Sequence, residues 1–258
     1  MIKYPLPHIN LLVILSLCLA VTKCLVPAVF GEELRSTPTQ IIQDWGGKTF
    51  FKKGELSEVI LNRANFKPGE ITILAAFNEI TDINLERNLL NEQDLSTLAN
   101  LPKLEWLNLY QTKISEEGAR ILSQSKSIKL LPLGKSDISD NSVIHLTKMK
   151  QLTYLGLRAN PVTNKSAPHL AKLINLEGLY LGETEITDQA IRKLVSLKKL
   201  TKLWLHDLKI TDACIHPLSQ LKRLQELHIY ATQISDTGAR FLKRKLPRCK
   251  VIHEHFPL

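Results

Sequence analysis

The stretch Leu104-Glu-Trp-Leu107-Asn-Leu109-Tyr-Gln-Thr112-Lys-Ile114 decides the fold of this chain. Leu107 and Leu109 alternate with polar or aromatic residues, which predicts a short strand with one buried face. The same spacing recurs every 24 residues from Leu56 to residue 247, in eight units without insertion or deletion. A period of this length is typical of stacked repeats, each of which is one small supersecondary unit.

The second half of each unit predicts a short helix. A serine or threonine stands eleven residues after the first position of six units, where it suits a helix N-cap; these residues are Ser115, Ser139, Thr163, Thr187, Thr211 and Ser235. Acidic residues mostly follow them, which favours a helix start. Apolar residues such as Ile191 and Leu194 then form an inward stripe. No unit buries its apolar face alone, so neighbouring units must stack.

The pattern resembles the leucine-rich repeat family over residues 56–253, and Ile186-Thr-Asp-Gln-Ala190 is similar to the short bacterial repeats of planctomycete-type proteins. The resemblance implies an α/β fold, a right-handed solenoid or arc with a concave parallel sheet and convex short helices. It also implies a ladder of polar side chains that hydrogen-bond the backbone between adjacent turns, at Asn88, Thr112, Ser136, Asn160, Thr184 and Thr232. Ala64 and Leu208 depart from the ladder, and Pro132 removes a backbone donor from the fourth strand.

The organisation that we predict has four parts. Residues 1–31 form a signal peptide or N-terminal anchor, because Leu11 to Val21 is an apolar run of eleven residues, shorter than the roughly 20 of a membrane span. Residues 32–55 form an N-terminal cap, residues 56–247 the eight repeats, and residues 248–258 a C-terminal cap. We therefore expect a secreted or periplasmic protein, or alternatively one anchored in the membrane by an uncleaved N-terminal segment. Cys18 and Cys24 lack the preceding small residue that a lipoprotein site needs.

Composition bounds the function without naming a ligand. The 258 residues are 44% hydrophobic and 23% charged, a composition that can bury a sizeable core. The net charge of +9 weakly favours anionic surroundings. Four cysteines are too few for a disulfide scaffold, and a bridge between Cys214 and Cys249 is possible without being predicted. The chain holds none of the common hydrolase, nucleotide-binding or zinc-protease motifs. We expect a non-enzymatic protein without a cofactor.

Aromatic residues point to the concave face. Strand positions between the buried ones face that side, and six of the eight tyrosines and tryptophans occupy them: Trp106, Tyr110, Tyr154, Tyr180, Trp204 and Tyr230. Tyrosine and tryptophan dominate binding hot spots, and Gly156, Gly178 and Gly182 leave room between the rings. We predict that these residues, with His206 and His228 as secondary contacts, bind a protein or polymer ligand. The alternative is an envelope-anchored structural module without a specific ligand.

Other polar clusters receive weaker interpretations. His206, Asp207, Glu226 and His228 include residue types that ligate zinc, but they are diagonal neighbours and Asp207 should turn away, so we expect rim histidines and no metal. His145 and His169 recur at one repeat position and are interpreted as solvated side chains. The basic C-terminal helix, which begins its charge run at Arg240, offers weak contact with anionic surfaces. An export signal makes nucleic acid an unexpected partner.

Overall fold

The computed structural model describes residues 37–253. The signal or anchor segment predicted for residues 1–31 lies outside these residues, as do residues 254–258. Within the described part, no helix is both long enough and apolar enough to span a bilayer.

The described chain begins with a capped helix and a hairpin. The Thr37 side chain accepts a hydrogen bond from the Gln40 backbone and starts helix α2 (Pro38–Asp44), with a proline in its first turn. Strands β1 (Lys48–Lys52) and β2 (Glu55–Ile60) then pair antiparallel, with an irregularity between Phe50 and Phe51. Strand β1 is therefore the first edge of the sheet, and its irregularity and its lysines, Lys48 and Lys52, disfavour pairing with another chain.

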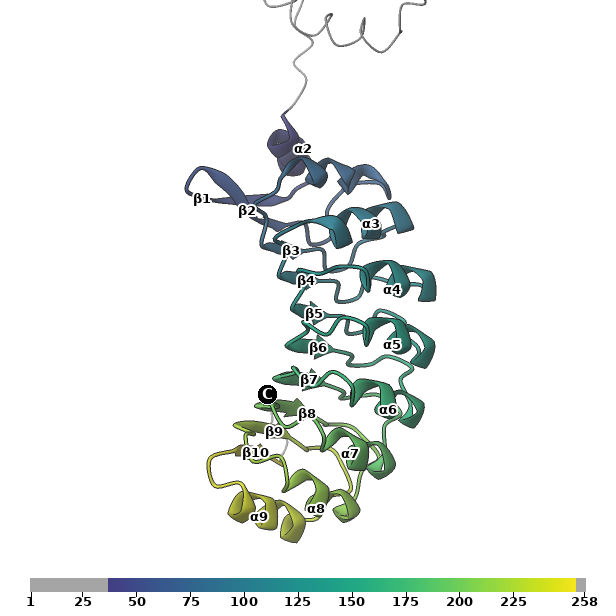
Figure 1. Ribbon diagram of the computed structural model, residues 1–258, viewed down its shortest axis with the longest axis vertical. Coiled ribbons are helices and arrows are strands. Elements are labelled where there is room, and N and C mark those ends of the chain that lie inside the picture. The colour runs from purple at the N-terminus through teal and green to yellow at the C-terminus, as the bar shows by residue number, and fades with distance from the viewer. Residues whose placement is uncertain (1–36, 254–258) are drawn as a thin grey trace, which may run out of the picture. The chain divides into compact units, whose positions relative to one another are not determined.

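One sheet of ten strands runs through the described residues in sequence order (Figure 1). All pairs from β2 onward are parallel, and paired residues lie 24 positions apart, as in Ile83 beside Leu107. The remaining strands are β3 (Asp82–Asn84), β4 (Trp106–Asn108), β5 (Leu130–Pro132), β6 (Tyr154–Gly156), β7 (Gly178–Tyr180), β8 (Lys202–Trp204), β9 (Glu226–His228) and β10 (Lys250–Ile252). The α/β repeat solenoid predicted from the sequence is confirmed.

Short helices cover the side opposite the strands (Figure 1). They are α3 (Glu92–Asn100), α4 (Glu116–Leu122), α5 (Asp140–Leu146), α6 (Ala167–Leu170), α7 (Asp188–Leu194), α8 (Ile215–Leu218) and α9 (Asp236–Lys245). The first repeat instead has a 3₁₀ segment, η1 (Glu70–Ala76), and η2 (Asn164–Ser166) and η3 (Asp212–Cys214) precede α6 and α8. Five of the six predicted N-caps accept a backbone hydrogen bond; Thr187 occupies the cap position without one.

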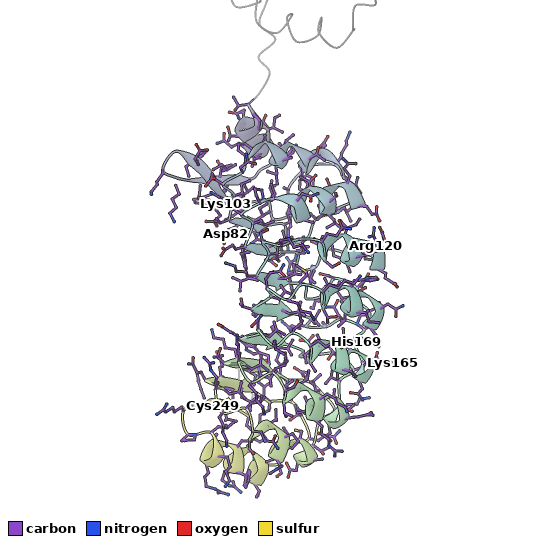
Figure 2. All side chains as sticks on the ribbon, viewed as in Figure 1. Asp82, Lys103, Arg120, Lys165, His169 and Cys249 are labelled. Atoms are coloured by element: carbon purple, nitrogen blue, oxygen red, sulfur yellow. The ribbon has the colours of Figure 1, made fainter. Side chains whose placement is uncertain are left out.

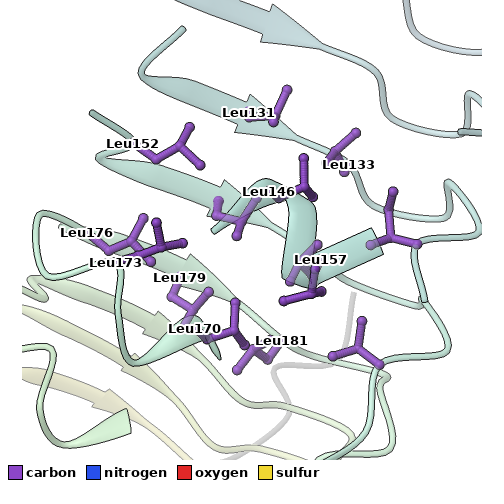
Figure 3. Close-up of a cluster of buried hydrophobic side chains, with 14 of the residues drawn as sticks. Leu131, Leu133, Leu146, Leu152, Leu157, Leu170, Leu173, Leu176, Leu179 and Leu181 are labelled. Atoms are coloured by element: carbon purple, nitrogen blue, oxygen red, sulfur yellow. The ribbon is translucent and has the colours of Figure 1, made fainter. Parts of the chain in front are cut away.

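The core is a column of leucines between the sheet and the helices. Each unit places the same positions inward, so that Leu131, Leu155 and Leu179 lie on successive strands and are fully buried. Figure 3 shows Leu131 and Leu179 in one cluster with leucines from the helices, such as Leu146 and Leu170. Burying a leucine side chain contributes about 1.5–3 kcal/mol, so the stacked units support one another.

A left-handed residue follows every strand of the eight repeats. The positive φ angles lie between 50° and 60° and recur at Arg63, Arg87, Gln111, Lys135, Ala159, Glu183, Asp207 and Ala231. None of these residues is a glycine, although glycine adopts this conformation most easily. The turn that sends the chain away from the sheet is therefore imposed by the backbone of each repeat, and the sequence indicated it only at Asp207.

The polar ladder connects adjacent turns only in the first half of the solenoid. Asn88, Thr112, Ser136 and Asn160 each donate to a carbonyl of the preceding unit, such as Leu61 O and Leu133 O. Thr184 and Thr232 instead bond carbonyls of their own unit, three residues earlier. The expectation that Thr184 and Thr232 bond the backbone of the adjacent turn is therefore wrong, because each hydroxyl donates to a carbonyl of its own unit.

A second ladder takes over at the helix starts of the C-terminal half. Asp140 accepts from the Thr163 backbone at 2.9 Å and from its hydroxyl at 2.7 Å, and Asp188 and Asp212 accept in the same way from the next unit. Asn164 joins the intervening pair of turns through Thr187. The sequence pattern predicted that these acidic residues favour helix starts. It did not predict that they also accept hydrogen bonds from the next unit.

Pro132 makes the sheet locally irregular, as its missing donor predicts. Strand β5 pairs with β4 only through Trp106 beside Leu130, whereas most parallel pairs have three residues in register. The Pro132 carbonyl still accepts from the Leu109 backbone at 3.0 Å. The lapse is thus confined to one position.

Candidate functional site

Six aromatic rings form one cluster on the exposed face of strands β6 to β9. Tyr154, Tyr180, Trp204 and His228 come from these four strands in turn, while His206 and Tyr230 lie two residues beyond the ends of β8 and β9. We call this cluster the aromatic patch: Tyr154, Tyr180, Trp204, His206, His228 and Tyr230. The strand register places the rings side by side, because Tyr180, Trp204 and His228 are direct neighbours across the sheet.

Every ring of the aromatic patch contacts another. Trp204 lies at its centre, with ring centroids 5.3 Å from Tyr180, 5.7 Å from His228 and 6.2 Å from Tyr154. His206 stacks on Tyr230 at 4.7 Å with an interplanar angle of 4°. Tilted and edge-on pairs of this kind are worth about 0.5–1.5 kcal/mol beyond the area they bury. The patch is therefore a packed platform rather than a set of separate side chains.

His206 is the inner support of the patch. It is 1% exposed, and both ring nitrogens are bonded, Nδ1 to Asp207 at 2.7 Å and Nε2 to the Tyr180 hydroxyl at 2.9 Å. Because the carboxylate only accepts, Nδ1 carries the proton, and in the neutral ring Nε2 accepts from Tyr180. The expected rim position of His206 is wrong, because its ring is buried against Tyr180 and Tyr230. Asp207 lies in the turn that leaves the sheet and stays partly exposed, but its carboxylate bonds back to His206.

Glycines on the strands and turns admit the rings. A Cβ added at Gly182 would lie 2.5 Å from His206 Nε2, and one added at Gly178 would lie 2.7 Å from the Tyr154 ring. The rings therefore occupy the space above the glycines, rather than lying between them. Burial, with a smaller contribution from Tyr180, raises the pKa of Tyr154 to about 12. Tyr154 is thus a neutral side chain at all ordinary pH values.

The structure does not bring all eight predicted residues together. Among the described residues, Trp106 and Tyr110 make no ring contact with the aromatic patch. Tyr110 instead lies over Gly134, where an added Cβ would come within 2.8 Å of its ring. The two residues share the face of the sheet but precede the tyrosine of β6 by two units.

Charged residues border the aromatic patch. Arg158 forms an ion pair with Glu183 that is about one-third exposed on both sides, and His228 Nε2 donates to Glu226 at 2.6 Å. Sequence reasoning did not single out Arg158 and Glu183. Their positions just after the strands could have indicated that they lie beside the aromatic residues. Burial raises the pKa of the Tyr180 hydroxyl, and the positive charge of Arg158 opposes this shift.

The cluster weighed as a zinc site is divided into two separate pairs. His206 bonds Asp207 and His228 bonds Glu226, so the two imidazoles do not share an acidic partner. Ligand atoms of Glu183, His206 and Asp207 lie within 4.8 Å of one another. Those groups already have partners, however, because both His206 nitrogens are bonded and Glu183 pairs with Arg158. These groups therefore serve to hold the rings of the aromatic patch through hydrogen bonds and an ion pair.

Two histidines and two cysteines that the sequence analysis discussed lie outside the aromatic patch. Figure 2 shows His169 on the helix side of the molecule and Cys249 near the last strand. His145 is mostly covered, and its Nδ1 is buried without a partner among the described residues, so the expected solvation of this side chain is wrong. Its Nε2 lies 3.6 Å from a carboxylate oxygen of Glu116 at the start of the preceding helix, α4. Cys214 and Cys249 are both free thiols, the first of them buried.

Solved structures similar to this chain include two internalins of Listeria monocytogenes strain 4b F2365. Internalin C2 is 30% identical, with a TM-score of 0.61, over 78% of this chain and 81% of that one. An internalin F is 20% identical, with a TM-score of 0.48, over 77% of this chain and 67% of that one. No protein-family model and no curated protein matches the sequence.

Proposed function

Because the chain belongs to the leucine-rich repeat proteins, we propose that it is a non-enzymatic recognition scaffold that binds a protein through its concave sheet. The observation that carries this proposal is the aromatic patch, in which rings from four successive strands pack into one partly exposed platform. Large rigid rings supply contact area at low entropic cost. Arg158, Glu183 and Glu226 provide a charged rim around them, as in typical interfaces.

The contact surface consists of Tyr154, Tyr180, Trp204 and Tyr230, with His228 at its side. His206 acts through the rings it holds, since 1% exposure leaves it no surface for a ligand. Trp106 and Tyr110 belong to a second, smaller part of the same face. A protein segment that crosses the strands would contact both parts, whereas a short segment would contact the aromatic patch alone.

The proposed location is secreted or periplasmic, with an uncleaved N-terminal segment as the alternative. The apolar run Leu11 to Val21 supports export. The short bacterial repeat type also remains our interpretation of the 24-residue register and of the Ile-Thr-Asp motif at Ile186. Neither cofactor nor metal enters the proposed function.

A comparative pull-down from the native envelope tests the proposal. The wild-type chain is compared with the variant Tyr154→Ala/Tyr180→Ala/Trp204→Ala, which removes the platform. The matched control is Trp106→Ala/Tyr110→Ala, which removes rings from the same face outside the patch. We expect a partner that the wild type and the control recover and the triple variant loses by about tenfold or more, since each hot-spot ring is worth at least about 2 kcal/mol.

Two further measurements make the comparison decisive. Urea unfolding of each variant shows whether the fold persists, and Tyr180→Phe removes only the hydroxyl that bonds His206. Equal recovery of every protein by the wild type and a folded triple variant would contradict the recognition role. It would favour the alternative of an envelope-anchored structural module.

A further inference from the structure

A second surface lies at the edge of the solenoid where each helix leads into the next strand. In the N-terminal units two lysines of this edge are neutralised by glutamates. Lys103 pairs with Glu79 and Lys129 with Glu105, each at 2.6 Å. The edge carries fewer unpaired cations there than in the last units.

In the C-terminal units the same edge carries cations without acidic partners. We call this surface the basic edge, and its residues are Lys150, Lys198, Lys199, Lys222, Arg223 and Arg248. All six side chains are exposed. No carboxylate of the described residues lies within 4.0 Å of any of them. Their bonds go to neutral groups, as when Lys199 Nζ donates to the Asn175 amide oxygen at 2.7 Å.

The repeat brings these cations into one row. The Gln225 backbone donates to Thr201 O at 2.7 Å, and the Lys250 backbone donates to Gln225 O at 2.7 Å, so three successive turns are stacked directly. Lys199 and Arg223 occupy the same place in successive units, 24 residues apart. Stacked strands are separated by about 4.8 Å. The charges therefore follow one another along a line across the flank of the molecule.

An open hollow lies on the last turns, at the end of this row. Its volume is about 560 Å³, and its lining consists of Thr201, Lys222, Arg223, Leu224, Gln225 and Arg248. Three of these residues are cations and none is acidic. Guanidinium groups match the oxygens of a phosphate in a two-pronged geometry, and an ammonium adds a compact charge.

The lining also narrows the class of ligand. No aromatic side chain lines the hollow, so it offers no platform for stacking nucleobases. The row of like charges needs several anionic groups in succession, because one small anion would neutralise only one end of it. A linear polymer with regularly spaced phosphates satisfies both requirements.

We propose that the basic edge binds a linear phosphate polymer. Lys222, Arg223 and Arg248 hold one phosphate in the hollow, and Lys198 and Lys199 bind the phosphates that follow. The site lies on a different surface from the aromatic patch and does not depend on the protein-binding role proposed for it.

The test measures binding of end-labelled linear polyphosphate to the full-length chain by fluorescence anisotropy. The variant Lys222→Gln/Arg223→Gln/Arg248→Gln, which we call the hollow variant, removes the three positive charges that line the hollow. The matched control Lys165→Gln/Arg192→Gln/Lys193→Gln removes three exposed cations from the helix side, so that both variants have the same net charge. A second variant, Lys198→Gln/Lys199→Gln, shortens the row. Urea unfolding confirms that each variant is folded.

We expect the hollow variant to weaken binding by about tenfold or more, and to reduce the slope of log affinity against log salt by roughly 2–3, because each phosphate contact contributes about 0.7–0.9. The Lys198/Lys199 variant should show an intermediate loss of affinity. The helix-side control should bind within about twofold of the wild type, because it loses no phosphate contact. Equal losses in the hollow variant and the control would overturn the site.

Two competing probes check the class of ligand. A sulfated polysaccharide should compete less well than polyphosphate of equal charge, and vesicles of anionic phospholipid should bind the wild type and the hollow variant alike. Stronger competition by the sulfated polymer would overturn the assignment to phosphate. Vesicle binding that the hollow variant alone loses would assign the surface to a membrane instead.

Discussion

At the scale of single residues, the aromatic patch depends on a glycine. An added methyl group at Gly182 meets His206 at 2.5 Å, and this ring cannot retreat because Tyr230 stacks on it and Asp207 and Tyr180 bond its nitrogens. We predict that Gly182→Ala lowers the free energy of unfolding by about 1–3 kcal/mol, as overpacking does. It should also weaken capture of the concave-face partner.

The control for this prediction is Gly134→Ala. Its added Cβ meets the Tyr110 ring at 2.8 Å, outside the patch. Urea unfolding should show a stability loss for both variants, whereas only Gly182→Ala should affect partner capture. Unchanged stability of Gly182→Ala would mean that the His206 ring moves freely, contrary to its contacts.

The left-handed residues after the strands give a second prediction at this scale. Ala231 is exposed and has a φ of 52°. A β-branched side chain in this conformation is strained by about 1–3 kcal/mol. We expect Ala231→Val to lower the free energy of unfolding by that amount, while Ala213→Val, at an exposed alanine without positive φ, has a smaller effect. Equal urea midpoints for the two variants would contradict the strain.

At the scale of elements, adjacent units are joined by different polar residues in the two halves of the solenoid. Asp140 illustrates the second ladder, since Thr163 donates to it twice and Ser166 donates through its hydroxyl. Hydrogen bonds to a charged acceptor contribute about 1.5–3 kcal/mol. We therefore predict that Asp140→Ala lowers the free energy of unfolding by about 2–3 kcal/mol, measured by urea titration.

The same carboxylate makes a prediction about pH. Burial opposes its ionisation, but the bonds from Ser166 and Thr163 outweigh burial and lower the pKa of Asp140. Because the folded pKa lies below the unfolded value, the stabilisation is present above the ordinary aspartate range near pH 4 and is lost as the pH falls through the folded pKa. The stability gap between the wild type and Asp140→Ala should thus shrink in acid. A gap independent of pH would contradict this role of the charge.

At the scale of the whole molecule, the core protects a thiol. Cys214 is fully buried in the last turns, and burial, together with the nearby charge of Asp188, raises its pKa. Burial also raises the pKa of Cys249 to about 11, with a smaller contribution from Glu226. We predict that alkylation near pH 8, followed site by site with mass spectrometry, modifies Cys249 slowly and Cys214 only when urea opens the solenoid.

The sign of the alkaline effect follows from these raised pKa values. Each folded thiol holds its proton more tightly than the unfolded one, so its contribution to stability falls as the pH rises above the ordinary thiol range near 8.5. Cys214→Ala lacks this group, and its stability should decline less steeply above that range. Rapid native alkylation of Cys214 would show that the last turns open locally.

Much of the architecture followed from the repeat alone. A strict period of 24 residues places like residues over like, and the alternation around Leu107 and Leu109 decides which side chains face the core and which face the concave side. The face that carries Tyr154, Tyr180 and Trp204 was therefore predictable from local geometry, because a strand alternates its side chains between two faces.

The composition of the site depended on contacts between units. Which rings pack together, why His206 is buried while Trp106 stands apart, and how Arg158 pairs with Glu183 are decided by side chains that meet across neighbouring turns. The change from the polar ladder to the second ladder and the hollow beside Arg248 arise in the same way. A period assigns each residue a position, but rotamers, burial and charge pairing depend on the particular residues at that position in the units on either side.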